Sequence, residues 1–158
     1  MQLPSQEYNQ SITEYYPLYR GGSVESTIIL PPSNFSRNFE KETSIFLKKL
    51  NDIEQLKSLY IFENSEEIKR FLLSHDYLID CLSEAYDQIR GIFEENLIEI
   101  CLEYDRDSEE DFEGLFVTIK TNLSPEPSLD LLEKFDDNWW LQVDFKIRSL
   151  ITIMVRPV

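Results

Sequence analysis

The chain has 158 residues, with 30 Asp and Glu against 15 Lys and Arg, so its formal net charge is −15. Residues 61–158 hold 23 acids and 9 bases, a net of −14, whereas residues 1–60 hold 7 and 6, a net of −1. Such a field repels nucleic-acid phosphate and anionic lipid, and it favours a basic partner. We therefore expect neither nucleic-acid nor membrane binding.

Residues 1–40 are predicted to form an extended arm that is rich in tyrosine. The tyrosines stand among polar residues and prolines at Tyr8, Tyr15, Tyr16 and Tyr19. Within the arm, residues 23–30 predict one short strand, which ends at Pro31-Pro32 because proline donates no ladder hydrogen bond. The arm either packs on the main body or binds a partner or another copy. Residues 41–158 are predicted to form a single acidic domain.

Three helices are predicted in the first half of this domain. Phe46, Leu50, Ile53 and Leu56 follow helical spacing within residues 38–59, where Asn51-Asp52 marks a bend or a break. Asn64 followed by Glu67 matches a capping box and predicts a second helix start. The clearest helix spans residues 77–93, with Gly91 near its end. Its apolar face comprises Leu78, Cys81, Leu82, Ala85, Ile89 and Ile92.

The second half predicts strands around one further helix. Residues 98–104 alternate apolar and polar side chains, and residues 115–120 do the same, so the two form a hairpin. Ser124-Pro125 opens a helix whose apolar stripe is Leu129, Leu132, Phe135 and Trp139. A last strand covers residues 149–155. The predicted fold is α+β: N-terminal helices, then strand-strand-helix-strand, with helices on one face of a small sheet. If the last strand pairs in parallel, the preceding helix is the crossover.

The acidic stretch over residues 105–113 has three interpretations: a solvated hairpin loop, a surface for a basic partner, or a calcium site. As an EF-hand loop starting at Asp105 it fails, because position six is Glu110 instead of glycine and position twelve is Phe116 instead of glutamate. Unpaired carboxylates are costly to bury, so we expect this stretch to face water or a partner.

No catalytic or cofactor motif is found. His75 is the single histidine and falls at a predicted helix junction. Cys81 lies on an apolar helix face, and Cys101 lies between two glutamates, which should raise its pKa. These cysteines belong to no CxxC pair, which indicates a reduced cytoplasmic protein.

The aromatic string Phe135-Asp136-Asp137-Asn138-Trp139-Trp140-Leu141 is the most distinctive local feature. On a helix, Phe135 and Trp139 share a face, and Trp140 lies about 100° round. One tryptophan then anchors the helix to the sheet. The other either completes the core or anchors a partner.

This string, together with three others, resembles a group of small, uncharacterised acidic bacterial proteins that is frequent in cyanobacteria. The other strings are Phe71-Leu72-Leu73, Leu82-Ser83-Glu84-Ala85-Tyr86 and Thr121-Asn122-Leu123-Ser124-Pro125-Glu126. The resemblance covers residues 64–158. It implies a shared fold and no assigned activity.

The sequence favours a non-enzymatic protein-binding module, such as an antitoxin, an immunity-like inhibitor or a nucleic-acid mimic, that occludes a basic partner. No cofactor and no metal site is expected. The residues predicted to bind the partner are Asp105, Asp107, Glu109, Glu110, Asp111, Asp136, Asp137, Trp139 and Trp140. Two alternatives stay open: an enzyme whose carboxylates, among them Glu99, Glu103, Asp136 and Asp144, converge only in the fold, and a homo-oligomer such as a homodimer built through the tyrosine arm.

Overall fold

The computed structural model describes residues 33–109 and 111–158. The chain divides into two units, Met1–Ser36 and Arg37–Val158, and the second contains the sheet and the helices that cover it. The predicted tyrosine arm up to residue 32, with its strand over residues 23–30, lies outside the described residues, as does Glu110. Residues 33–40, predicted as the extended end of this arm, are instead the start of α1.

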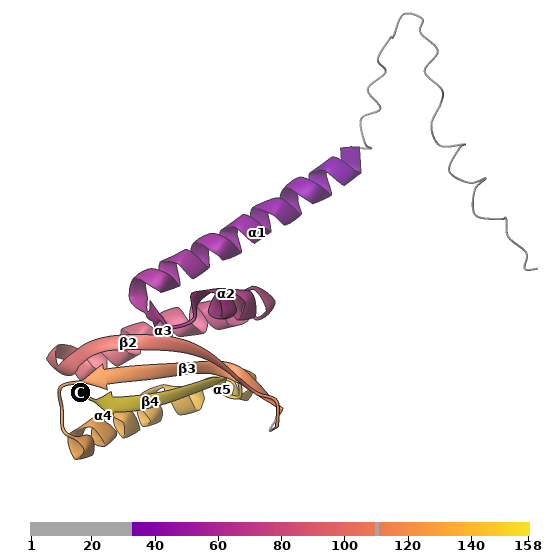
Figure 1. The fold of residues 1–158 in the computed structure, drawn as a ribbon. Helices are drawn as coiled ribbons and strands as arrows, with labels where there is room; N and C mark the ends of the chain where they lie inside the picture. The colour runs from indigo at the N-terminus through magenta and orange to yellow at the C-terminus, as the bar shows by residue number, and fades with distance from the viewer. Residues whose placement is uncertain (1–32, 110) are drawn as a thin grey trace, which may run out of the picture. The chain divides into compact units, whose positions relative to one another are not determined.

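The domain has an α+β fold, as predicted (Figure 1). In chain order its elements are α1 (Ser33–Leu59), β1 (Ile61–Phe62), α2 (Ser65–Ser74), α3 (Tyr77–Phe93), η1 (Glu94–Asn96), β2 (Leu97–Asp107), β3 (Phe112–Thr121), α4 (Pro125–Asn138), η2 (Trp140–Gln142), α5 (Phe145–Arg148) and β4 (Ile151–Pro157).

The four strands form one mixed sheet in the order β1-β2-β3-β4. β2 and β3 are the predicted antiparallel hairpin, with Leu102 opposite Val117. β4 pairs in parallel with β3, so α4 is the crossover between them. The two-residue β1 pairs in parallel with β2 at the other edge.

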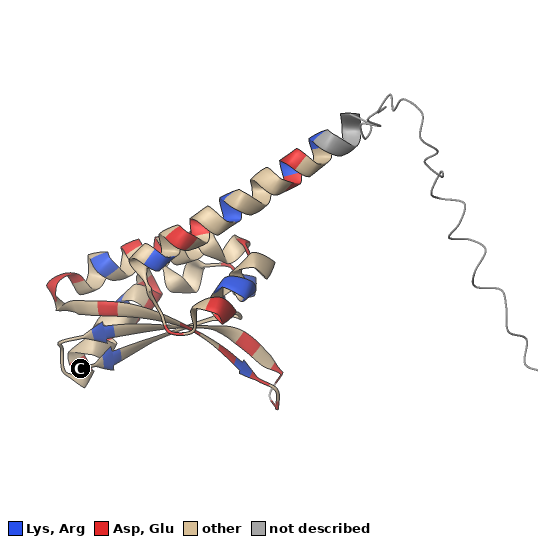
Figure 2. Cartoon of the chain, turned by 45° about the horizontal axis from the view of Figure 1, so that its top comes forward, with Lys and Arg blue, Asp and Glu red and all other residues tan. Residues whose placement is uncertain are grey.

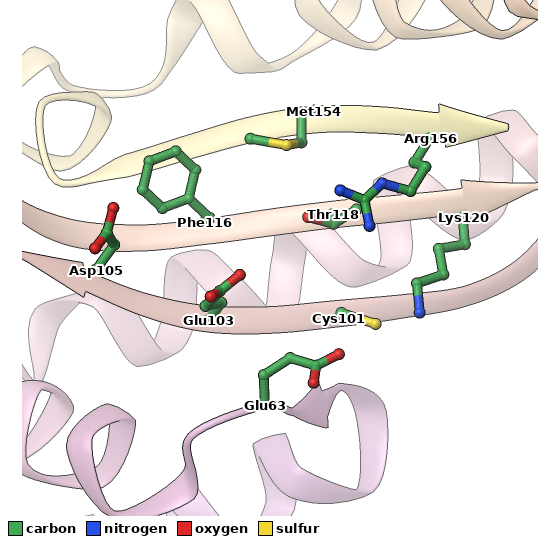
Figure 3. A pocket seen from close by; sticks show the side chains of 9 residues that line it. All are labelled: Glu63, Cys101, Glu103, Asp105, Phe116, Thr118, Lys120, Met154 and Arg156. Carbon is green, nitrogen blue, oxygen red and sulfur yellow. The ribbon is translucent and has the colours of Figure 1, made fainter.

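Helices and sheet share one core on a single face of the sheet. Leu102, Leu115, Val117 and Ile119 point into it and are fully buried. They pack in one cluster with α2, α3 and α4, whose largest buried contributions include Leu78, Leu82, Ile89 and Phe135. Burying a side chain of this size stabilises a fold by about 1.5–3 kcal/mol. Within the described residues, the opposite face of the sheet carries no helix, as Figure 3 shows.

Two helices differ from their predictions. α1 continues through Asn51-Asp52 without a break. α4 turns Leu132, Phe135 and Trp139 inward as predicted, but at its start Leu129 is 57% exposed and Ser128 is fully buried in its place. The Ser128 hydroxyl donates to the Ser124 carbonyl at 2.7 Å, so its polar atom is satisfied inside the helix.

The capping box at Asn64 is wrong in mechanism, although α2 does begin at the next residue. The Asn64 side chain makes no cap hydrogen bond. Instead its amide nitrogen donates to the Tyr104 carbonyl at 2.9 Å, and its side-chain oxygen accepts from the Tyr104 N–H at 2.9 Å. Asn64 therefore extends the pairing of the short strand β1 along β2.

Candidate functional site

The β2–β3 hairpin continues past the end of the four-stranded sheet. β4 joins β3 at Leu115, whereas β2 and β3 stay paired as far as Asp107 and Phe112. We call residues 105–114 the hairpin arm. Figure 2 shows acidic residues along it.

The carboxylates of the hairpin arm lie on the surface of the protein. All five that are described are exposed: Asp105, Asp107, Glu109, Asp111 and Glu113. Asp105 accepts the Arg106 N–H and Asp107 accepts the Glu109 N–H, each at 2.8 Å, which orders the turn. Asp111 has a φ of 52°, a left-handed conformation that Asp tolerates.

An aromatic pair lies among these acids, on the sheet face that none of the described helices covers. Phe112 and Phe116 meet edge to face, with ring centroids 5.9 Å apart. Gly114 lies between them in the strand, and a Cβ there would come within 2.9 Å of the Phe112 ring. The missing side chain at Gly114 thus lets Phe112 lie over the strand.

The charges on the open sheet face are separated along the strands. A depression of about 300 Å³ has Glu103 and Asp105 toward the hairpin arm, Lys120 and Arg156 toward the other end, and Glu63 between them near Cys101 (Figure 3). Lys120 pairs with Glu99 at 2.5 Å. Arg156 makes no ion pair with any residue that the structure describes.

Neither cysteine is suited to act as a nucleophile. Burial raises the pKa of the Cys81 thiol to about 11, with a smaller contribution from Glu84. Burial is also the main cause that raises the pKa of Cys101; Lys120 lowers it, while Glu63 and Glu99 raise it. Both thiols are therefore protonated at neutral pH.

The tryptophans lie on the helical side of the sheet, away from the arm's open face. Trp140 is core, 8% exposed and stacked on Phe135 with centroids 6.4 Å apart. Trp139 ends α4 as its C-cap and still meets Phe135, with ring centroids 5.6 Å apart, as predicted, whereas Trp140 lies beyond the helix and its expected helical placement is wrong. The half-buried Trp139 donates from Nε1 to Glu84 at 2.9 Å.

The two acids beside the tryptophans also differ in how far they are exposed. Asp137 is exposed, whereas Asp136 is half-buried. Burial, with a smaller effect of Asp137, raises the pKa of Asp136. The residues predicted to bind a partner thus fall into two groups, one on the hairpin arm and one on the helical layer.

Trp139 lines a groove of about 430 Å³ between α3 and the segment from α4 to α5. Tyr77, Trp139, Val143 and Ile147 provide its apolar surface, and Asp80 and Glu84 are its acidic members. We call this the helix-layer groove. Exposed Leu141 and Phe145 flank its lining residues in sequence.

The carboxylates considered for an enzyme do not line a common cavity in the described part of the chain. Glu103 lines the depression on the sheet face, whereas Asp144 caps α5, where it accepts the Lys146 N–H at 2.7 Å. His75 ends α2, stacked on Phe71 with its Nδ1 3.0 Å from the Phe71 carbonyl. Among the described residues, no three His, Cys, Asp or Glu are grouped to hold a metal ion. None of the described helices combines the length and apolar character that crossing a membrane requires.

Comparison of the chain with protein-family models, curated proteins and solved structures gives no match. The site therefore has to be interpreted from its own geometry. Sequence reasoning missed Glu63, Phe112, Phe116 and Arg156 as parts of one surface. The alternation of β3 gave a signal for Phe116, since the residues between Leu115, Val117 and Ile119 must face away from the core.

Proposed function

We propose that the protein is a binding module for a basic protein partner and that the hairpin arm is the main contact. The observation that carries this proposal is the clustering of exposed carboxylates around a pair of half-buried phenylalanines on a projecting hairpin. Charge attracts the partner from a distance, and aromatic rings supply the apolar contact that retains it.

The charges on the open sheet face favour one orientation of the bound partner. A basic side chain of the partner is attracted to Glu103 and Asp105, whereas Arg156 repels it at the other end, where Glu99 offsets the charge of Lys120. A partner with a row of basic residues therefore has one favoured orientation on the arm. Covering such a row on a nuclease would occlude its substrate-binding surface, as an antitoxin, an immunity-like inhibitor or a nucleic-acid mimic does.

The proposal is tested by affinity capture from the organism that encodes the chain. The arm variant carries Asp105→Asn, Asp107→Asn and Glu109→Gln. The control removes the same charge from exposed positions of α4, with Glu126→Gln, Asp130→Asn and Glu133→Gln. We expect a basic protein that is retained by the wild type and by the control and lost with the arm variant. Its association rate should fall as salt rises.

Two outcomes would reject the proposal. In the first, the arm variant and the α4 control retain the same proteins equally well, which would make the charge of the arm irrelevant. In the second, the captured proteins are acidic, which would rule out electrostatic attraction to this surface.

A further inference from the structure

The first half of α1 is exposed in the described chain, and only its end, at Ile45 and Lys48, borders a depression with Tyr77 and Asp80 of α3. Every side chain from Arg37 to Lys48 is exposed. The exposed apolar residues include Phe39, at 65%, and Phe46, at 49%. They lie fourteen and seven residues before Ile53, which is fully buried, so all three share one side of the helix. Ile45 and Leu47, also exposed, flank Phe46. The apolar side of α1 thus begins in water and ends in the core.

This half of α1 is also the basic part of an acidic molecule. Residues 37–49 contain four bases and two acids, a net of +2, whereas residues 50–158 contain 10 bases and 25 acids, a net of −15. Arg37, Lys41 and Lys48 lie on the side of α1 opposite Phe46, at helical spacing. The exposed half therefore suits an occupant that is apolar in its centre and acidic around it.

The helix-layer groove has that character. Its apolar lining is formed by Tyr77, Trp139, Val143 and Ile147, and its acidic members are Asp80 and Glu84. The first half of α1 cannot bend into the groove of its own chain, because α1 is one continuous helix from Ser33 to Leu59. Its second half is fixed to the core by Ile53 and Leu56, and Lys49 is paired with Asp76 at 2.6 Å.

We propose that residues 37–48 of α1 bind in the helix-layer groove of a second copy. Residues 37–48 of that second copy bind in the groove of the first in the same way. The exchange has twofold symmetry and closes on itself, so it ends at a dimer. Twelve helical residues span about 18 Å, so Phe39 and Phe46 on one side of this segment lie close enough together to enter the same groove. The dimer goes beyond the binding of a basic partner and does not depend on it, because the hairpin arm takes no part.

Sedimentation equilibrium on the full chain tests the dimer. The α1 variant carries Phe39→Asp and Phe46→Asp. Its control carries Ser44→Asp and Asn51→Asp, which add the same charge at exposed positions away from the apolar side. The groove variant carries Asp80→Lys and Glu84→Lys, and its control carries Glu126→Lys and Asp130→Lys on α4. Circular dichroism verifies that each variant is folded.

The wild type should form a dimer at about 100 µM, and the α1 and groove variants should each raise its dissociation constant about tenfold or more. Both controls should keep the wild-type value. An equimolar mixture of the α1 variant and the groove variant should associate more tightly than either alone, because one of its two contacts is intact.

Three results would overturn the exchange. A wild type that stays monomeric at that concentration has no such contact. A groove variant that dimerises like the wild type means that α1 pairs with α1 and leaves the groove empty. A mixture that associates no better than its components excludes a contact between α1 and the groove.

Discussion

At the residue scale, Gly114 is the position where the hairpin arm depends most on the absence of a side chain. A Cβ there would lie 2.7 Å from the Leu150 carbonyl oxygen and 2.9 Å from the Phe112 ring. That same carbonyl accepts the Leu115 N–H at 2.8 Å, where β4 begins to pair with β3. The glycine thus keeps the base of the arm and the start of β4 close together.

Gly114→Ala should therefore lower the free energy of unfolding by about 1–3 kcal/mol, because backbone at Leu150 has to move to accept the methyl group. Urea unfolding measures the loss. Gly91→Ala is the matched control, since nothing lies within 4 Å of a Cβ at this position in the last turn of α3. It should stabilise the fold by about 0.5–1 kcal/mol through helix propensity. Equal effects at the two positions would contradict this packing argument.

At the scale of elements, the clearest case is the junction of β1 and α2. β1 has only two residues, so its pairing with β2 is short. The Glu63 N–H donates to the Leu102 carbonyl at 3.0 Å, and the Asn64 side chain then makes both of its bonds to the Tyr104 backbone. One amide side chain thus takes the place of a further strand residue.

Asn64→Asp distinguishes this role from helix capping. Asp and Asn are equally good N-caps, so a capping residue would tolerate the change. As a strand partner, however, Asp places a carboxylate oxygen against the Tyr104 carbonyl, and we expect a loss of about 1–3 kcal/mol in urea unfolding. Ser124→Asp, at the start of α4, is the control and should be neutral or slightly stabilising. If both substitutions are neutral, Asn64 is a cap after all.

How far the sequence predicts an element depends on the length of its pattern. α3 has the predicted bounds because its apolar period runs over four turns. β1 has no sequence pattern, since two residues show no period. These residues form a strand only because their backbone pairs with the edge of β2. The predicted face of α4 was wrong only at Leu129, because the polar Ser128 is buried there instead. Its hydroxyl is satisfied within the helix, and an apolar pattern gives no sign of such a residue.

The candidate site was predicted in the same uneven way. The carboxylates of the hairpin arm follow from composition, because a run of acids between two alternating strands has to be a solvated turn. The position of Trp140 did not follow, since α4 ends at Asn138 and a 3₁₀ turn reorients the chain at Trp140. Which face of the sheet stays open depends on where the helices pack, and this is a property of the tertiary fold.

At the scale of the whole molecule, acidic side chains far outnumber the ion pairs that offset their charge. The described residues form three ion pairs: Lys49 with Asp76, Lys57 with Glu54, and Lys120 with Glu99. The net charge of the chain is nevertheless −15. Repulsion among surface carboxylates therefore affects folding more than attraction within the pairs does, and salt screens both.

The melting temperature should consequently rise with salt. Between about 10 and 200 mM sodium chloride at neutral pH, screening should stabilise the fold by about 1 kcal/mol, or about 2–4 °C for a chain of this length. Differential scanning calorimetry in dilute solution, where the protein is monomeric, measures the shift without a contribution from association. The same series at a pH of about 4 is the control, because carboxylates half-protonated there carry much less repulsion and the salt effect should shrink. A melting temperature that falls with salt at neutral pH would contradict this argument. It would mean that attraction within the three ion pairs stabilises the fold more than repulsion among the surface carboxylates destabilises it.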